Sequence, residues 1–343
     1  MPALTSKHAT VLVTGANGFI ATWIVGYLLE QGYSVRAAVR IAKKGEHLLR
    51  TYASYGDKLK LVEVGDVSVD NAFDEAVKGV DGIIHTASPV GLYADEPSEM
   101  IDPAVKGVVG ILQSAQKHAG HQLARIVITS SCAAISHFST VPITLSEADW
   151  NDGPVKECEE KGRNADNLSK YAASKVLAAW EFVDKHKSEI TWDIAVINPP
   201  WVFGPVKHDV ASFETLPPSN QYFYNAVIKG DILGGFPAIT TPGHGFVDVR
   251  DVAYAHIRAL EAPAAGGERI ICCAGSFVWQ DIIDVANWLS PKPYHTIAKG
   301  EPGEKFRAIT WNTEKQKRIL GIKFRTLESI VRETLTQWAG RGY

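Results

Sequence analysis

Short apolar runs alternate with longer amphipathic stretches from residue 10 to residue 200. The run at residues 11–13 is apolar and mostly β-branched, as in a strand buried on both faces, and apolar residues then recur at helical spacing from Phe19 to Leu28. Similar runs follow, and they predict strands at residues 33–39, 60–64, 82–87, 125–129 and 192–197. This alternation of strands and helices predicts a parallel sheet covered by helices on both faces.

The pattern changes near residue 204, where shorter helical stretches are separated by proline, glycine and aromatic residues. We therefore predict an α/β protein, with a Rossmann-type doubly wound parallel sheet and a smaller C-terminal region that binds substrate. Residues 1–204 are expected to form the sheet domain, and residues 205–343 mainly the second region, with some segments returning to the first. The polar segment 138–167 is expected to be an irregular surface excursion.

Composition excludes several classes of protein. The chain has 343 residues, a hydrophobic fraction of 45% and a net charge of −3, and no long basic run would draw it to nucleic acid or to an anionic membrane surface. No apolar stretch is long enough to span a membrane. We expect a soluble cytoplasmic protein that acts on a small molecule. Amphipathic helices predicted at 97–118 and 168–187 can pair between subunits or pack on the sheet, so both a monomer and a homodimer fit.

The sequence predicts no metal site. The four cysteines, Cys132, Cys158, Cys272 and Cys273, show no Cys-x-x-Cys spacing, and the eleven histidines show no clustered ligand pattern. Cys272 and Cys273 stand in an apolar run, where we expect them to be buried as small hydrophobic residues.

A glycine turn joins the first predicted strand to the first predicted helix. Gly15 and Gly18 stand in this turn, and small Ala21 lies one turn inside the helix. Residues without Cβ let the backbone approach a pyrophosphate, while the helix N-terminus presents free N–H groups and the positive end of its dipole. The turn therefore predicts a dinucleotide site, in which we expect contacts from Gly15, Asn17, Gly18, Phe19 and Ile20.

The end of the second predicted strand favours NADPH over NADH. An acid near this position takes the ribose hydroxyls of NAD in dinucleotide folds. Arg40 stands there instead, and Lys43 and Lys44 follow it. A guanidinium grips phosphate through two parallel hydrogen bonds, so this group suits the extra phosphate of NADPH. Asp66, after the third strand, either accepts from the adenine amino group or caps the next helix.

Tyr171 and Lys175 stand four residues apart, so a helix places the phenol and the ammonium on one face. We expect the ammonium to favour the phenolate and to lower the pKa of the phenol, which suits a proton donor or acceptor. Ser130 and Ser131 end the strand predicted at 125–129, at the sheet edge where ligands bind in open α/β folds.

Together these motifs resemble the extended short-chain dehydrogenases/reductases. Within them, the chain is most similar to the fungal NADPH-dependent aldehyde and ketone reductases and the plant dihydroflavonol reductases. The resemblance covers nearly the whole chain and rests on the segments VLVTGANGFIA, HTASPV, ITSS, YAASK, INPPWVFGP and FVDVRDVAYAHIRAL. It implies that residues 1–204 are an NADP-binding Rossmann domain that carries the catalytic Ser131, Tyr171 and Lys175.

The resemblance implies a role for each matching position. Tyr171 is expected to protonate the carbonyl oxygen, Lys175 to lower the pKa of the phenol and hold the nicotinamide ribose, and Ser131 to hydrogen bond the carbonyl. Arg40 and Lys44 match the contacts to the 2′-phosphate. The other cofactor contacts implied are Asp66 and Val67 at the adenine, Thr86, Ala87 and Ser88 at the end of the fourth strand, and Pro199, Pro200 and Val202 at the carboxamide.

Two positions depart from the pattern of the family. Ala21 replaces the third glycine of many relatives, but it is small enough for the same packing of helix on strand. The asparagine of the classical members has no obvious counterpart, and Lys106 stands in that stretch instead. A proton relay through Lys106 is therefore an open question.

The sequence favours an NADPH-dependent carbonyl reductase of aldehydes, ketones and ketoesters. Its alternatives are a sugar-nucleotide epimerase or dehydratase of the same extended family, and a non-catalytic protein that senses dinucleotides. For each candidate in the pocket wall, ordinary core packing is the competing interpretation. These apolar candidates are Val90, Ala133, Phe138, Trp201, Phe203, Tyr222 and Phe223.

Overall fold

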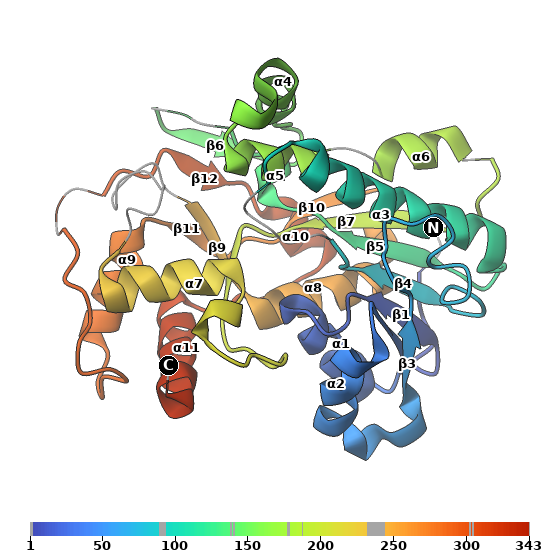
Figure 1. Cartoon of the computed structure of the whole chain (residues 1–343), viewed down its shortest axis with the longest axis horizontal. Helices are drawn as coiled ribbons and strands as arrows, with labels where there is room; N and C mark the ends of the chain where they lie inside the picture. Colours follow the sequence, from blue (N-terminus) through green and yellow to red (C-terminus); the bar gives the residue numbers. More distant parts are fainter. Residues whose placement is uncertain are drawn as a thin grey trace.

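The computed structural model describes residues 3–88, 94–137, 139, 141–176, 179–186, 188–231, 244–301, 303 and 305–342. A seven-stranded sheet forms its centre (Figure 1), in the order β10-β7-β5-β4-β1-β2-β3, and every neighbouring pair in it is parallel. The strands are β1 (Thr10–Thr14), β2 (Ser34–Val39), β3 (Leu59–Glu63), β4 (Gly82–His85), β5 (Arg125–Thr129), β7 (Asp193–Asn198) and β10 (Arg269–Ile271). The doubly wound parallel sheet predicted from the sequence is confirmed.

The order of the strands creates a site for a ligand. The chain moves outward from β1 to β3 in one direction and then, from β4, outward in the other. At the point where the order reverses, helices leave toward opposite faces and open a crevice at the carboxyl ends of β1 and β4. The glycine turn after β1 lies at this point.

Helices cover both faces of the sheet because its strands are apolar on both sides. On β1, Val11 and Val13 pack in one core with α1 (Phe19–Glu30) and α8 (Val249–Glu261), whereas Leu12 packs in a second core with α3 (Ser98–His118). This alternation follows from side chains that point to opposite faces of a strand. Two smaller helices, α5 (Asn167–Val176) and α6 (Ala179–His186), lie on the same side as α3 (Figure 1).

Segments from beyond residue 204 complete the sheet and its helical layers. Strand β10 forms one edge by pairing with β7, and α8 packs beside α1. The sequence pattern did not assign β10 as a strand, because three residues are too few to show a period. The run that continues it holds Cys272 and Cys273, which are buried as expected.

The C-terminal region has a core rich in aromatic residues. A sheet in the order β11-β9-β8 joins β8 (Trp201–Phe203), β9 (His244–Asp248) and β11 (Gly275–Phe277). Helices α7 (Pro218–Tyr224), α9 (Trp279–Trp288) and α11 (Leu327–Arg341) lie on the left in Figure 1 and contribute to its core. Shorter helices elsewhere are α2 (Glu46–Thr51) and α10 (Glu314–Ile319).

The segment predicted as an irregular excursion at 138–167 contains regular structure. Strand β6 (Ile143–Leu145) pairs with β12 (Ile309–Trp311), and α4 (Gly153–Lys161) follows it. The expectation was wrong because the partner of β6 lies far away in the sequence, and because α4 is mostly polar and shows little apolar periodicity. None of the helices among the described residues is both long and apolar enough to cross a membrane.

Candidate active site

The structure brings Ser131, Tyr171 and Lys175 together at the carboxyl end of β5. Ser131 follows the strand and begins a short 3-10 helix, while Tyr171 and Lys175 stand one turn apart on α5. A side-chain hydrogen bond links Tyr171 to Ser131. The ammonium of Lys175 lies 5.3 Å from the centroid of the Tyr171 ring. Two segments that are distant in sequence thus present a hydroxyl, a phenol and an ammonium at one place.

Hydrogen bonds to the backbone hold this group. The Ser130 hydroxyl donates to the carbonyl of Lys175 over 3.1 Å and ties the strand end to the helix. The Asn198 amide donates to the carbonyl of Ser131 over 2.8 Å, and the Ser131 hydroxyl accepts from the N–H of Ala133 over 3.0 Å. The Ser131 hydroxyl is therefore held by the turn that it begins, and the Ser131 backbone by the end of β7.

Burial decides the electrostatics of the site. It raises the pKa of Tyr171, and the hydrogen bond with Ser131 only partly offsets the rise. It also lowers the pKa of Lys175 to about 8. The expectation that Lys175 lowers the pKa of the phenol is therefore not met in this structure. The free-energy cost of removing the phenolate from water exceeds the stabilisation that neighbouring groups give it. At neutral pH the phenol keeps its proton.

The glycine turn forms a close cradle against the end of β4. Gly15 has a φ of +61°, and a Cβ there would lie 3.0 Å from the Cα of Ala87. The Thr14 hydroxyl accepts from the N–H groups of Thr86 and Ala87, each over 3.1 Å. Phe19 and Ile20 begin α1, so their N–H groups face the turn as free donors at the helix N-terminus.

Thr14 and His85 are site residues that the sequence analysis missed. The Thr14 hydroxyl already accepts two backbone N–H groups, so its own proton points to Nδ1 of His85, 3.0 Å away. Burial and the nearby charge of Lys175 lower the pKa of His85 to about 3, so the imidazole is neutral. The sequence offered one signal for Thr14, a hydroxyl residue at the end of a strand and directly before the glycine turn.

The basic group expected at the 2′-phosphate is exposed at the end of β2. Arg40 and Lys44 both lie on the surface, and Lys44 belongs to a short 3-10 helix (Ala42–Gly45). Hydrogen bonds from Ser68 lower the pKa of the Asp66 carboxyl, and the charge of nearby Arg40 lowers it further. The carboxylate of Asp66 accepts from the N–H and the hydroxyl of Ser68, so its observed bonds stabilise a local turn.

The residues expected at the carboxamide follow β7. The carbonyl of Pro199 accepts from the N–H of Cys132 over 2.9 Å, which places it beside the serine loop, the segment after β5 that carries Ser130 and Ser131. Pro200 is half-buried, and Val202 is buried in the core shared by the sheet, α1 and α8. Burial also raises the pKa of Cys132 well above its usual range, which leaves the thiol protonated and a poor nucleophile.

The predicted pocket wall divides into three groups. Ala133, Trp201 and Tyr222 are partly exposed, and the rings of Trp201 and Tyr222 meet edge to face with centroids 5.6 Å apart. Phe203 and Phe223 are fully buried, with centroids 5.4 Å apart, so they form part of the core rather than the wall of an open pocket. Val90 and Phe138 lie outside the described residues.

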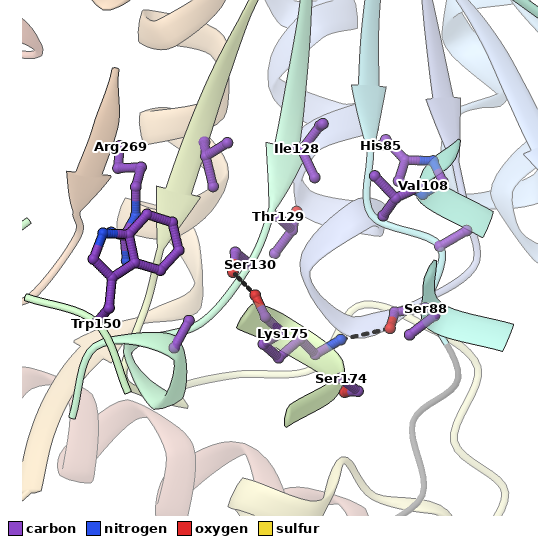
Figure 2. Close-up of a pocket in the computed structure, with 14 residues that line it drawn as sticks. His85, Ser88, Val108, Ile128, Thr129, Ser130, Trp150, Ser174, Lys175 and Arg269 are labelled. Atoms are coloured by element: carbon purple, nitrogen blue, oxygen red, sulfur yellow. Dashed lines mark hydrogen bonds between the residues drawn. The ribbon is translucent and has the colours of Figure 1, made fainter. Parts of the chain in front are cut away.

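A cavity lies behind Lys175, between the sheet and α3 (Figure 2). Figure 2 shows Lys175 between Ser130 and Ser88, with its ammonium 2.5 Å from the Ser88 hydroxyl. The other lining residues include His85 and, at the far end, Trp150, whose ring stacks on Arg269. This space adjoins the side chain of Lys175.

Lys106 does not reach this cavity. Ala104 and Val108 of α3 line it, whereas Lys106 is exposed. Residues two positions apart on a helix point to nearly opposite sides, so Lys106 faces solvent when its neighbours face the sheet. The structure gives no support to a proton relay through Lys106.

Among the described residues, no group of three or more histidine, cysteine, aspartate or glutamate residues is arranged to hold a metal ion.

A model of the NAD dependent epimerase/dehydratase family matches residues 11–274. The chain belongs to this family, the extended short-chain dehydrogenases/reductases. It is 33% identical over 340 residues to the NADPH-dependent methylglyoxal reductase GRE2 of Saccharomyces cerevisiae, covering 96% of this chain and 97% of that protein. It is 34% identical over 341 residues to the ketoreductase azaE of Aspergillus niger, covering 95% and 96%.

A solved structure of a yeast reductase has the same fold. The crystal structure of the yeast methylglyoxal/isovaleraldehyde reductase Gre2 complexed with NADPH superimposes with a TM-score of 0.87 at 31% identity. The match covers 97% of this chain and 99% of that one. The likeness therefore extends beyond the sheet to the C-terminal region.

Proposed function

We propose that this protein reduces aldehydes, ketones and ketoesters to alcohols, with Tyr171 as the proton donor. The convergence of Ser131, Tyr171 and Lys175 beside the glycine turn is the observation that carries this proposal. Relatives that match over almost their whole length are named methylglyoxal reductase and ketoreductase, and the chain is an NADPH-dependent oxidoreductase.

The chain has the features that NADPH requires. The cradle at Gly15 has no room for a side chain, and the N-terminus of α1 offers free N–H groups for the pyrophosphate. Arg40 and Lys44 are accessible for the 2′-phosphate. When bound, NADPH supplies the hydride that reduces the carbonyl carbon. Further contacts are proposed for Asn17, Gly18, Phe19, Ile20, Asp66, Val67, Thr86, Ala87, Ser88, Pro199, Pro200 and Val202.

The three catalytic residues act on the carbonyl oxygen and its proton. The Ser131 hydroxyl donates a hydrogen bond to the carbonyl oxygen and stabilises the negative charge that develops on it. Tyr171 then gives its proton to this oxygen as the alcohol forms. The raised pKa of the phenol keeps that proton in place until the oxygen becomes basic. Lys175 lies over the ring and stabilises the phenolate that remains.

The substrate is proposed to enter between the serine loop and the C-terminal region. Ala133, Trp201 and Tyr222 are the partly exposed members of the predicted wall, so they are the proposed substrate contacts. Tyr222 belongs to residues 205–343, which are proposed to form the rest of this side of the pocket. A cytoplasmic location, and a monomeric or homodimeric state, are proposed from the sequence.

An epimerase or dehydratase is the main rival within the family. Such enzymes usually keep NAD tightly bound and carry an acid at the end of the second strand, where this chain has Arg40. Free exchange of NADPH with solution separates the two functions. A non-catalytic sensor would be expected to lack Tyr171 or Lys175, and this chain has both.

The deciding experiment measures oxidation of NADPH and of NADH with methylglyoxal, phenylglyoxal, isovaleraldehyde and a β-ketoester. We expect fast turnover with NADPH, little with NADH, and one equivalent of alcohol for each NADPH consumed. Absence of turnover in protein that binds NADPH would contradict the reductase and favour its rivals.

A further inference from the structure

Lys170, the residue directly before Tyr171 on α5, is buried, with 2% of its surface exposed. Its ammonium donates to the backbone carbonyls of Ala94 over 2.8 Å, Asp95 over 2.9 Å and Arg163 over 2.9 Å. An ammonium has three N–H donors and no acceptor, so these three carbonyls use all of them. Lys170 is therefore a fully bonded internal cation.

The three carbonyls come from two separate segments. Ala94 and Asp95 precede α3, while Arg163 belongs to the 3-10 helix Gly162–Asn164, between α4 and α5. The side chain of Lys170 joins both segments to the first turns of α5. Asn167 adds a weaker link, because its side-chain oxygen accepts from the N–H of Ala94 over 3.3 Å.

A buried cation is an expensive way to fill this space. Taking an ammonium out of water costs free energy, and its hydrogen bonds do no more than compensate for this cost. An apolar side chain of similar length avoids the cost altogether. What three directed bonds add is a fixed position. A methionine would fill the volume, but it would leave the two segments free to shift relative to α5.

The same bonds fix how α5 is rotated about its axis. Lys170 and Ala173 share one face of the helix, and Ala173 packs in a small core with Cys158 and Ala165. Successive side chains on a helix are separated by about 100°, so fixing this face also fixes the direction of Tyr171. At the other end of the helix, the bond from Ser130 holds the carbonyl of Lys175.

We propose that Lys170 is a positioning residue, which sets the rotation of α5 and so directs the Tyr171 phenol toward Ser131 and the carbonyl oxygen. This inference rests on the proposed function, since it assigns to Lys170 the alignment of the proton donor. Small errors in the position of a reacting group are costly, and a shift of about 1 Å can reduce a rate by about 100-fold.

The test compares Lys170→Met with Lys170→Arg. Lys170→Met keeps the length of the side chain but removes its charge and its hydrogen-bond donors. Lys170→Arg keeps the charge and the donors. We expect Lys170→Met to lower kcat by about 10-fold to 100-fold, with KM and the Kd of NADPH within about twofold of wild type. The kcat of Lys170→Arg should be at least about fivefold higher than that of Lys170→Met. Lys156→Met is the matched control, because Lys156 is an exposed lysine of α4.

Two results would overturn the inference: a kcat for Lys170→Met within twofold of wild type, or equal kcat values for Lys170→Met and Lys170→Arg. Rates are expressed per NADPH-binding site, so that unfolded protein does not count. If Lys170→Met does not fold, Lys170→Gln takes its place, since it retains an amide donor, and an intermediate kcat is expected. An unchanged kcat in Lys170→Gln would also contradict the inference.

Failure of the proposed function is visible separately. It appears as wild-type protein that binds NADPH and reduces no carbonyl compound. In that case, hydrogen–deuterium exchange of residues 167–176 tests the lysine clamp alone, that is, the bonds from the Lys170 ammonium to its three backbone carbonyls. Faster exchange in Lys170→Met than in Lys156→Met supports the clamp, and equal exchange rejects it.

Discussion

The ammonium of Lys175 lies 5.3 Å from the centre of the Tyr171 ring, but its hydrogen bond goes to the hydroxyl of Ser88. The lysine therefore connects two parts of the site, the proton donor on α5 and the segment that follows β4. Its charge is close enough to stabilise a phenolate once one forms, without forming a direct bond to the phenol oxygen in this structure.

Tyr171→Phe removes the proposed proton donor and leaves the ring. We expect kcat for carbonyl reduction to fall by about 100-fold to 10,000-fold, the usual range for loss of a general acid, while the Kd of NADPH stays within about twofold. Steady-state kinetics and a fluorescence titration with NADPH measure the two quantities. Tyr254→Phe is the control, because Tyr254 is an exposed tyrosine on α8. Substantial turnover by Tyr171→Phe would remove Tyr171 from its assigned role.

Lys175→Met should stabilise the cofactor-free fold while it destroys activity. Burial lowers the pKa of Lys175 to about 8 from its ordinary 10.5, so the folded protein carries the cost of a desolvated charge at neutral pH. We expect the free energy of unfolding at pH 7 to rise by about 1–3 kcal/mol, less than the full shift implies because Lys175 keeps some contact with solvent.

The pH dependence of this stability difference has a definite sign. Below pH 8 both the folded and the unfolded wild type hold the Lys175 proton, so the whole cost is present. Between about pH 8 and 10.5 the unfolded state binds more protons, and wild-type stability rises with pH. The advantage of Lys175→Met should therefore shrink across that window in urea titrations. An advantage that is absent at pH 7, or constant with pH, would contradict the burial of a charged lysine.

Arg40→Ala tests the preference for NADPH. Charge-assisted hydrogen bonds contribute about 1.5–3 kcal/mol, so we expect kcat/KM for NADPH to fall by about 10-fold to 100-fold and that for NADH to change little. Arg50→Ala is a suitable control, since Arg50 is an exposed arginine of α2 that pairs with Glu46 on the same helix. An equal loss with both cofactors would show that Arg40 does not read the 2′-phosphate.

Gly15→Ala should damage the cofactor site more than Gly79→Ala. Both glycines have positive φ, +61° and +68°, so both substitutions carry a similar backbone strain of about 1–2 kcal/mol. At Gly79 a Cβ meets nothing within 4 Å, whereas at Gly15 it would lie 3.0 Å from the Cα of Ala87. We expect Gly15→Ala alone to weaken NADPH binding by at least about 10-fold. Calorimetry of both variants measures this, and equal affinities would show that the cradle has room for a side chain.

The sequence by itself determined the features that depend on neighbouring residues. Six of the seven strands of the sheet, the glycine turn before α1 and the shared helix of Tyr171 and Lys175 follow from local spacing, because strand and helix periods are properties of the backbone. Arg40 at the end of β2 was equally visible, since its place depends only on where one strand stops.

Only the tertiary structure decided which of these residues are buried and what they contact. It added β10 to the sheet, turned Lys106 toward solvent and placed Phe203 and Phe223 in the core. It also raised the pKa of Tyr171, where the sequence predicted a lower one. Burial and long-range hydrogen bonds arise when segments far apart in the chain pack together. Such contacts leave no periodic signal in either segment, and the lysine clamp beside Tyr171 is of this kind.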